Sequence, residues 1–228
     1  MENKTINTKI VAQVAEALEE LNQKMAFVGG AVISLYTDDP AADEIRPTVD
    51  IDLAVQLTGF GEWTRLNDRL LELGFMPNPD GKSICDYRYK GIEIDIMPSE
   101  NSHIGISNSW YKPGFSSLQT KQVENTTVQI LSAPYFLATK LEAFHDRGGD
   151  YRFSHDFEDV IYVIDNRTHI VEECLNADSE VRNFIKSELK KVIDSPYCEE
   201  YIRTQIHPIM AEERYPMVLE KILKIAQG

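Results

Sequence analysis

The sequence contains little cysteine and no long apolar run. Its three cysteines are widely scattered and form no close pair of the kind that zinc sites use. Neither a disulfide framework nor a zinc site is indicated, and such cysteine usage fits a reducing compartment. No stretch reaches the about 18 apolar residues of a membrane-spanning helix, and the first twenty residues carry charges throughout. We therefore expect a cytoplasmic protein without a membrane segment.

Positive charge is scarce as well. The chain has 23 Lys and Arg against 37 Asp and Glu, which gives a formal net charge of −14. This balance argues against a broad basic surface for nucleic acid, although a local contact with phosphate remains compatible with it. A site rich in carboxylates attracts divalent cations, whereas a well-solvated surface explains the same acidity equally well.

The hydrophobic pattern divides the chain into a sheet region and a helical region. The first residues show helical periodicity, which predicts an amphipathic helix. Short apolar segments separated by glycine and proline turns follow and predict strands. From Ser132 onward, apolar residues recur at helical spacing. We therefore place a domain boundary near Ser132, with domains at 1–131 and 132–228. Residues 101–125 give mixed signals and are expected to form a long loop.

Acidic and apolar residues alternate in the segment VDIDLAVQL. Because side chains alternate between the faces of a strand, Asp50 and Asp52 should lie on one side and Ile51 on the other. The segment IEIDIMP repeats the pattern with Glu93 and Asp95. If the two strands are neighbours, their acids converge in the arrangement that two-metal phosphoryl transfer uses. A solvated strand face also carries alternating acids, so the first segment alone does not distinguish the two interpretations.

Two glycines end an apolar strand directly before a predicted helix. Gly29 and Gly30 follow MAFV and precede AVISLY. Without side chains the backbone can approach an anion closely, and the free amides of a helix start favour phosphate. A tight turn without any ligand uses the same residues, so this pair is weak evidence alone.

The order of these features resembles a known superfamily. FVGGAVISLY followed by RPTVDIDLAV is similar to the polymerase-β-like nucleotidyltransferase signature of apolar strand, two small residues, helix, and acid-x-acid on the next strand. The segment that leads into the acid-x-acid strand looks most like the corresponding segment in the branch that contains AbiEii-type toxins. A later block, TKLEAFHDRGGDYRFSHDFEDV, is also similar, but it has His155 where relatives have a lysine. The resemblance covers residues 27–160.

The resemblance implies an α+β nucleotidyltransferase fold, in which a mixed β-sheet with flanking helices precedes a helical C-terminal domain. The implied catalytic and metal-binding residues are Asp50, Asp52 and Asp95, with Mg²⁺ or Mn²⁺ as the ion. The implied nucleotide-binding residues are Gly29, Gly30, Arg46 and Lys140. A solvated surface position would also explain Lys140. Ser154 has the character of a helix N-cap, so we expect the following Asp156 and Asp159 to be structural.

The implied reaction transfers a nucleoside monophosphate from a nucleoside triphosphate to a hydroxyl group. A tRNA end, a protein side chain and a small molecule such as an aminoglycoside are all compatible acceptors. The AbiEii resemblance also implies a toxin with an antitoxin protein as partner. A non-catalytic interaction module with the same fold and an antibiotic nucleotidyltransferase remain alternatives. A glycosyltransferase is a weaker alternative, because such enzymes usually place a larger nucleotide-binding region before the acid-x-acid strand than this chain has.

Overall fold

The computed structural model describes residues 2–19, 21, 25–48, 50–57, 59–100 and 107–228. These residues form two compact units. One comprises the chain up to Leu35 together with Glu44–Ser132, and the other comprises Tyr36–Asp43 together with Ala133–Gly228. The short segment Tyr36–Asp43 therefore belongs with the helices, although sheet elements precede and follow it in the sequence.

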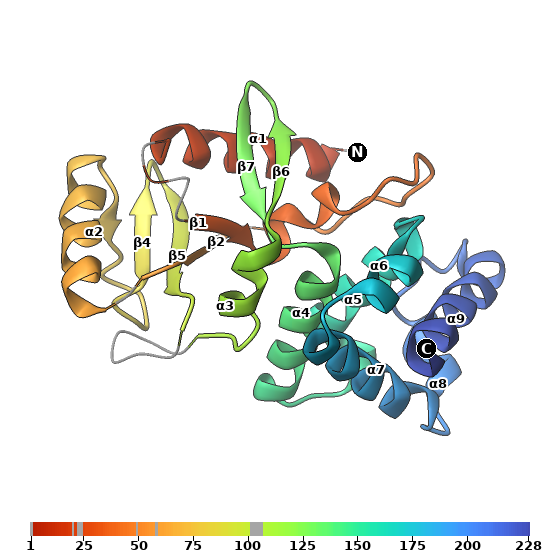
Figure 1. The fold of residues 1–228 in the computed structure, drawn as a ribbon. Coiled ribbons are helices and arrows are strands. Elements are labelled where there is room, and N and C mark those ends of the chain that lie inside the picture. The colour runs from red at the N-terminus through yellow and green to blue at the C-terminus, as the bar shows by residue number, and fades with distance from the viewer. Residues whose placement is uncertain (1, 20, 22–24, 49, 58, 101–106) are drawn as a thin grey trace. The chain divides into compact units, whose positions relative to one another are not determined.

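The first unit is built on a seven-stranded sheet with the order β3-β4-β5-β2-β1-β7-β6 (Figure 1). The sheet is mixed, because β1 pairs in parallel with β7 and β2 in parallel with β5, whereas the other neighbours are antiparallel. The internal strand β1 is buried along its whole length, as its continuous apolar sequence MAFV predicts. The strands are β1 Met25–Val28, β2 Asp50–Val55, β3 Met76–Pro77, β4 Asp86–Tyr89, β5 Ile92–Pro98, β6 Gln119–Val123 and β7 Thr126–Ile130.

Helices flank this sheet. The helix α1 contacts β6, β7 and η2, and it buries Val11, Val14 and Ala15, which lie on one face at helical spacing. The predicted helix after the glycine pair is present as a 3₁₀ helix, η2. The helices of this unit are α1 Glu2–Ala17, η2 Gly30–Leu35, α2 Phe60–Glu72, α3 Tyr111–Gly114 and η3 Phe115–Ser117.

The expectation of a long loop at residues 101–125 was wrong for the part that the structure describes. Residues 101–106 lie outside the described residues, but the helices α3 and η3 and the strand β6 occupy most of the remainder. The strand β6 has the sequence QTKQV and lies at the edge of the sheet, where only Val123 is fully buried. An edge strand that is polar on both faces shows no alternation of apolar residues, so hydrophobic periodicity could not predict it.

The second unit is helical. Its helices α4, α5, α7 and α9 pack against one another. Ser154 caps α5 by accepting a hydrogen bond from the Phe157 amide at 3.2 Å, as its position predicts. No helix in the described ranges is both apolar enough and long enough to cross a membrane. The helices are α4 Ala133–Arg147, η4 Tyr151–Phe153, α5 His155–Asn166, α6 Ile170–Asn176, α7 Ser179–Ile193, α8 Cys198–Arg203 and α9 Ala211–Gln227.

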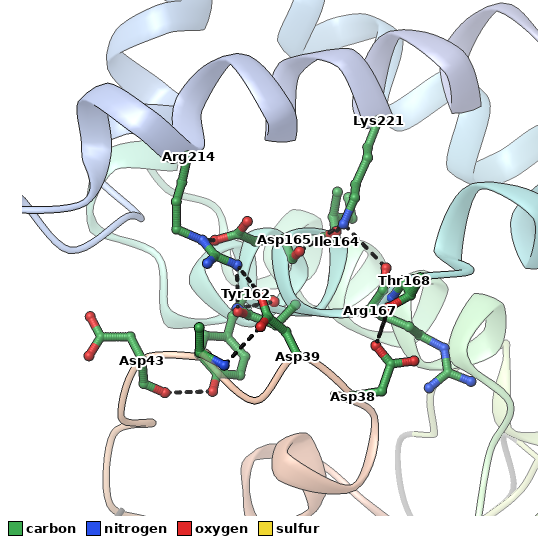
Figure 2. A network of polar contacts seen from close by, with 12 residues as sticks. Asp38, Asp39, Asp43, Tyr162, Ile164, Asp165, Arg167, Thr168, Arg214 and Lys221 are labelled. Carbon is green, nitrogen blue, oxygen red and sulfur yellow. Dashed lines mark hydrogen bonds and ion pairs between the residues drawn. The ribbon is translucent and has the colours of Figure 1, made fainter.

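Two cations of α9 bind the C-terminal end of α5, and one of them also binds the segment Tyr36–Asp43 (Figure 2). Arg214 donates to Asp165 at 2.6 Å and to Asp39 at 2.9 Å. Lys221 donates to the carbonyl oxygens of Ile164 and Asp165 at 2.8 and 2.7 Å, where the last turn of α5 leaves such acceptors without helical partners. Positive charge at a helix C-terminus is also favourable for the helix dipole.

The same segment is held at further points. Asp38 accepts hydrogen bonds from the Thr168 amide and hydroxyl, both at 2.8 Å. The Arg167 guanidinium donates to the Tyr36 carbonyl oxygen at 2.7 Å, and the Tyr162 hydroxyl donates to the Asp43 carbonyl oxygen at 2.7 Å. These bonds span the whole segment, which explains why it belongs to the helical unit.

We predict that Arg214→Met destabilises the helical unit strongly. Burial raises the pKa of Asp165 even beside Arg214, so its charge depends on this partner, and removing one member of a buried ion pair costs roughly 3 to 5 kcal/mol. The measurement is the free energy of unfolding in urea. The matched control is Arg203→Met, because Arg203 pairs with the exposed Glu199 and Glu212 and its loss should cost about 1 kcal/mol or less. Equal losses in the two variants would contradict the structural role of Arg214.

Candidate active site

Parallel pairing of β2 with β5 brings the predicted carboxylates together. Asp52 lies in register with Asp95, and Asp50 lies in register with Glu93. Neighbouring residues of paired strands share a face, and strands lie about 4.8 Å apart. The alternate residue Ile51 is buried on the opposite face. The four acids therefore form a patch on one face of the sheet.

The strand β4 adds a carboxylate that the sequence analysis missed. It pairs antiparallel with β5 and places Asp86 opposite Asp95, so that Asp86, Asp95 and Asp52 form a row across three strands. The two-residue turn Lys90–Gly91, with φ angles of 49° and 84°, fixes this register. Counting back from that turn along both strands would have found Asp86.

Hydrogen bonds hold two of these carboxylates from the side. The Thr48 hydroxyl donates to Asp50 Oδ1 at 2.7 Å. Asp86 accepts from the amide of Lys82 at 2.6 Å and from the amide and hydroxyl of Ser83 at 3.0 and 2.7 Å. Burial of Asp86 acts to raise its pKa, but the hydrogen bonds from Ser83 outweigh this effect and leave the pKa below its ordinary value. Asp86 is therefore held as a charged group.

Asp95 has the opposite character. Burial is the largest cause that raises its pKa to about 6, and the negative charges of Asp86, Asp50 and Glu93 add to it. Of the nearby acids, Glu93 already has a cation beside it, since Arg88 lies 3.2 Å away. The middle carboxylate of the row is thus the one that gains most from a proton or from a cation.

The glycine turn lies directly against these acids. Gly29 has φ 71°, and a Cβ atom there would lie 1.8 Å from Asp52 Oδ2, so only glycine fits. A Cβ atom at Gly30 would lie 3.4 Å from Arg46 Nη2 and 3.6 Å from the Thr48 hydroxyl. The predicted residues Gly29, Gly30 and Arg46 therefore lie together with the Asp50 and Asp52 strand in the first unit.

Lys140, the remaining predicted residue, belongs to the helical unit. It is buried, and its Nζ lies 2.7 Å from Asp159 and 3.2 Å from Asp156. Asp156 also pairs with Arg147 at 2.5 Å. Asp156 and Asp159 thus neutralise the buried Lys140 in addition to any effect on the helix dipole. Lys140 already forms ion pairs with Asp156 and Asp159, and its contact with a triphosphate stays a prediction.

The chemistry of the carboxylate patch fits a small hard cation. Magnesium and manganese take oxygen ligands, and Mg²⁺ is usually held by one or two carboxylates, with water and substrate phosphates completing its shell. Among the described residues, no group of three or more His, Cys, Asp or Glu side chains is arranged so that it could hold a metal ion as it stands. Asp52 and Asp95, in register on adjacent strands, are the residues that would hold the ion, with Asp50 beside them.

Comparisons with known proteins agree with this architecture. A family described as "Nucleotidyl transferase AbiEii toxin, Type IV TA system" matches residues 14–222. The crystal structure of an antigenic nucleotidyltransferase-like protein from Paracoccidioides brasiliensis is similar, with a TM-score of 0.52 and 21% identity over 88% of this chain and 93% of that chain. No curated protein matches the sequence. The family resemblance and the α+β nucleotidyltransferase fold predicted from the sequence are confirmed.

We predict that Gly29→Ala destabilises the protein more than Gly91→Ala. Both glycines have positive φ, and an alanine in this conformation costs about 1 to 2 kcal/mol. Only at Gly29 would the new Cβ collide with Asp52, whereas it would meet nothing within 4 Å at Gly91. Urea unfolding of both variants measures the difference. Equal losses would show that Asp52 does not lie against the turn.

We also predict that Asp95 of the metal-free protein titrates near pH 6, which carbon-detected NMR can measure. Its folded pKa lies above the unfolded value, so the native state holds an extra proton between about pH 4 and 6. The associated stability is fully present below this window and is lost as the pH rises through about 6. Since the carboxyl group is only partly buried, we expect a loss of about 1 kcal/mol relative to Asp95→Asn. A titration near pH 4 would contradict the crowding of negative charge.

Proposed function

The chain belongs to the AbiEii family of nucleotidyl transferases, and from this premise we propose that it is a metal-dependent enzyme that transfers a nucleoside monophosphate to a hydroxyl group. The acceptor oxygen forms a bond to the α-phosphorus of a nucleoside triphosphate, and the bond to the bridging oxygen breaks to release pyrophosphate. The observation that carries this proposal is the register of β2 with β5, which aligns Asp52 with Asp95 beside Asp50.

The carboxylates have separate roles in this proposal. Asp50 and Asp52 bind the metal ion, and Thr48 orients the first of them. A bound Mg²⁺ or Mn²⁺ ion would supply positive charge that stabilises the attacking and leaving oxygens. Asp95 would hold the ion at the same site and would help to remove the proton of the acceptor hydroxyl. The raised pKa of Asp95 in the metal-free protein supports the metal-binding role, because a bound cation would offset the burial and the neighbouring negative charges that raise it.

The triphosphate is proposed to lie along the glycine turn. Gly29 and Gly30 let the backbone approach phosphate closely, and the Arg46 guanidinium lies beside Gly30. A guanidinium with its fixed set of donors suits phosphate oxygens. Lys140 is proposed as a further phosphate contact. Its ammonium group would then bind phosphate in addition to Asp156 and Asp159.

The acceptor is proposed to be a tRNA end, a protein side chain or a small hydroxylated molecule. With a net charge of −14, the chain is poorly suited to an extended contact with RNA, so a tRNA would enter by its end. The family description names a toxin of a type IV toxin–antitoxin system. It supports the proposal that this chain acts as such a toxin in the cytoplasm, with an antitoxin protein as its counterpart.

We predict that Asp50→Asn and Asp52→Asn each abolish nucleotide transfer while the protein stays folded. Removing either carboxylate should prevent metal binding, so the expected loss exceeds about a hundredfold. The assay incubates the protein with each labelled nucleoside triphosphate, Mg²⁺, total tRNA and cell lysate, and asks which molecule acquires label.

The matched control is Asp68→Asn, which removes an exposed carboxylate of α2 in the same unit. This variant should transfer label at the wild-type rate. Label transfer by Asp50→Asn and Asp52→Asn at wild-type rates would overturn the proposed mechanism. Triphosphate binding that does not depend on Mg²⁺, together with no transfer to any acceptor, would favour the non-catalytic module.

A further inference from the structure

The helix α1 carries a fully buried polar residue on its apolar face. Asn7 is 0% exposed and lies four, seven and eight positions before the buried Val11, Val14 and Ala15. These spacings place it on the same side of the helix as the core residues. An apolar residue would fill such a position without the cost of burying an amide group. The presence of asparagine at this position therefore indicates that its side-chain amide forms functional hydrogen bonds.

The amide of Asn7 brackets the segment that leads into β2. Its Nδ2 donates to the Arg46 carbonyl oxygen at 3.5 Å, and its Oδ1 accepts from the Thr48 amide at 3.4 Å. Pro47 lies between these two residues and has no N–H group. The carboxamide thus satisfies one acceptor and one donor on either side of the proline. Both bonds lie at the long end of the hydrogen-bond range, so each is weak alone. Together they fix the position of Arg46 and Thr48 relative to α1.

The bracketed residues are those that face the site. The Thr48 hydroxyl donates to Asp50 Oδ1, and both this hydroxyl and the Arg46 guanidinium lie beside Gly30. A path of contacts therefore runs from Asn7 through Thr48 to a proposed metal ligand. All of these residues belong to the first unit.

We propose that Asn7 is a positioning residue of the active site, which sets the place of Asp50 through Thr48 and that of Arg46 through its carbonyl group. This inference rests on the proposed function, because it assigns a role in the same reaction. A displacement of a positioned group by about 1 Å can reduce a rate up to a hundredfold. Asn7 touches neither substrate nor metal, so its loss should weaken the site without removing any ligand.

The test is a double-mutant cycle of Asn7→Leu and Thr48→Val, with kcat and the Mg²⁺ concentration for half-maximal activity as readouts. Each single variant should lower kcat about tenfold and raise the Mg²⁺ requirement, with a smaller effect on the KM for the triphosphate. If Asn7 acts through Thr48, the double variant should be little worse than the more impaired single variant. Thr48→Ser keeps the hydroxyl group and should restore most of the activity.

Val14→Ala is the matched control for lost stability. Val14 is fully buried in the same helix and its side chain has no hydrogen-bonding group, so this variant should unfold more easily but keep the wild-type kcat and Mg²⁺ requirement. If Asn7→Leu does not fold, Asn7→Ala replaces it in the cycle. Alanine favours the helix and removes both the acceptor for the Thr48 amide and the donor to the Arg46 carbonyl oxygen.

The possible results separate this inference from the proposed function. Values of kcat and Mg²⁺ requirement within twofold of wild type for Asn7→Leu or its replacement Asn7→Ala, or single effects that multiply in the double variant, would overturn the positioning role alone. A wild-type protein without transfer activity would overturn the proposed function. Calorimetric Mn²⁺ titration then decides the positioning role: weaker binding by Asn7→Leu than by wild type and Val14→Ala supports it, and equal or absent binding overturns it.

Discussion

The pairing of β2 with β5 forces like charges together, and the rest of the site depends on this constraint. The parallel register aligns Asp52 with Asp95 and Asp50 with Glu93, and the antiparallel neighbour β4 adds Asp86 to the same row. Local hydrogen bonds relieve part of the repulsion, since Thr48 donates to Asp50 and Ser83 donates to Asp86. Asp95, in the middle of the row, is left with a raised pKa. A divalent cation bound at this patch would offset the repulsion, and the proposed nucleotidyl transfer would use a cation there.

The segment between the glycine turn and β2 is fixed at both ends by different means. Its first half, Tyr36–Asp43, is bonded to α5, the turn after it and α9 by Arg214, Arg167 and Tyr162. Its second half is bracketed by Asn7 around a proline that cannot donate a backbone hydrogen bond. The second set of contacts holds the chain that carries Arg46, Thr48 and Asp50. Buried polar contacts of this kind specify one position, which fits a segment whose side chains are proposed to contact phosphate and metal.

Sequence patterns predicted the faces of the strands but not their full neighbourhood. Alternation in DID and IEIDIM placed Asp50, Asp52 and Asp95 on the face opposite the buried Ile51 and Ile94, because the period of a strand is fixed by geometry. The parallel pairing of these strands depends on contacts distant in sequence, and Asp86 became visible only through its register with Asp95. Lys140 has a polar neighbourhood that no periodicity encodes, since its partners Asp156 and Asp159 lie on another helix. The polar edge strand β6 was missed because it lacks an apolar face.

The most direct test of this account is a crystal structure of the protein soaked with Mn²⁺ and a non-hydrolysable nucleoside triphosphate analogue, measured at the manganese absorption edge. The account predicts an anomalous peak within bonding distance of carboxylate oxygens of Asp50, Asp52 or Asp95, with the triphosphate along Gly29 and Gly30. Manganese bound elsewhere on the chain, or a triphosphate bound without any ion at these carboxylates, would contradict it.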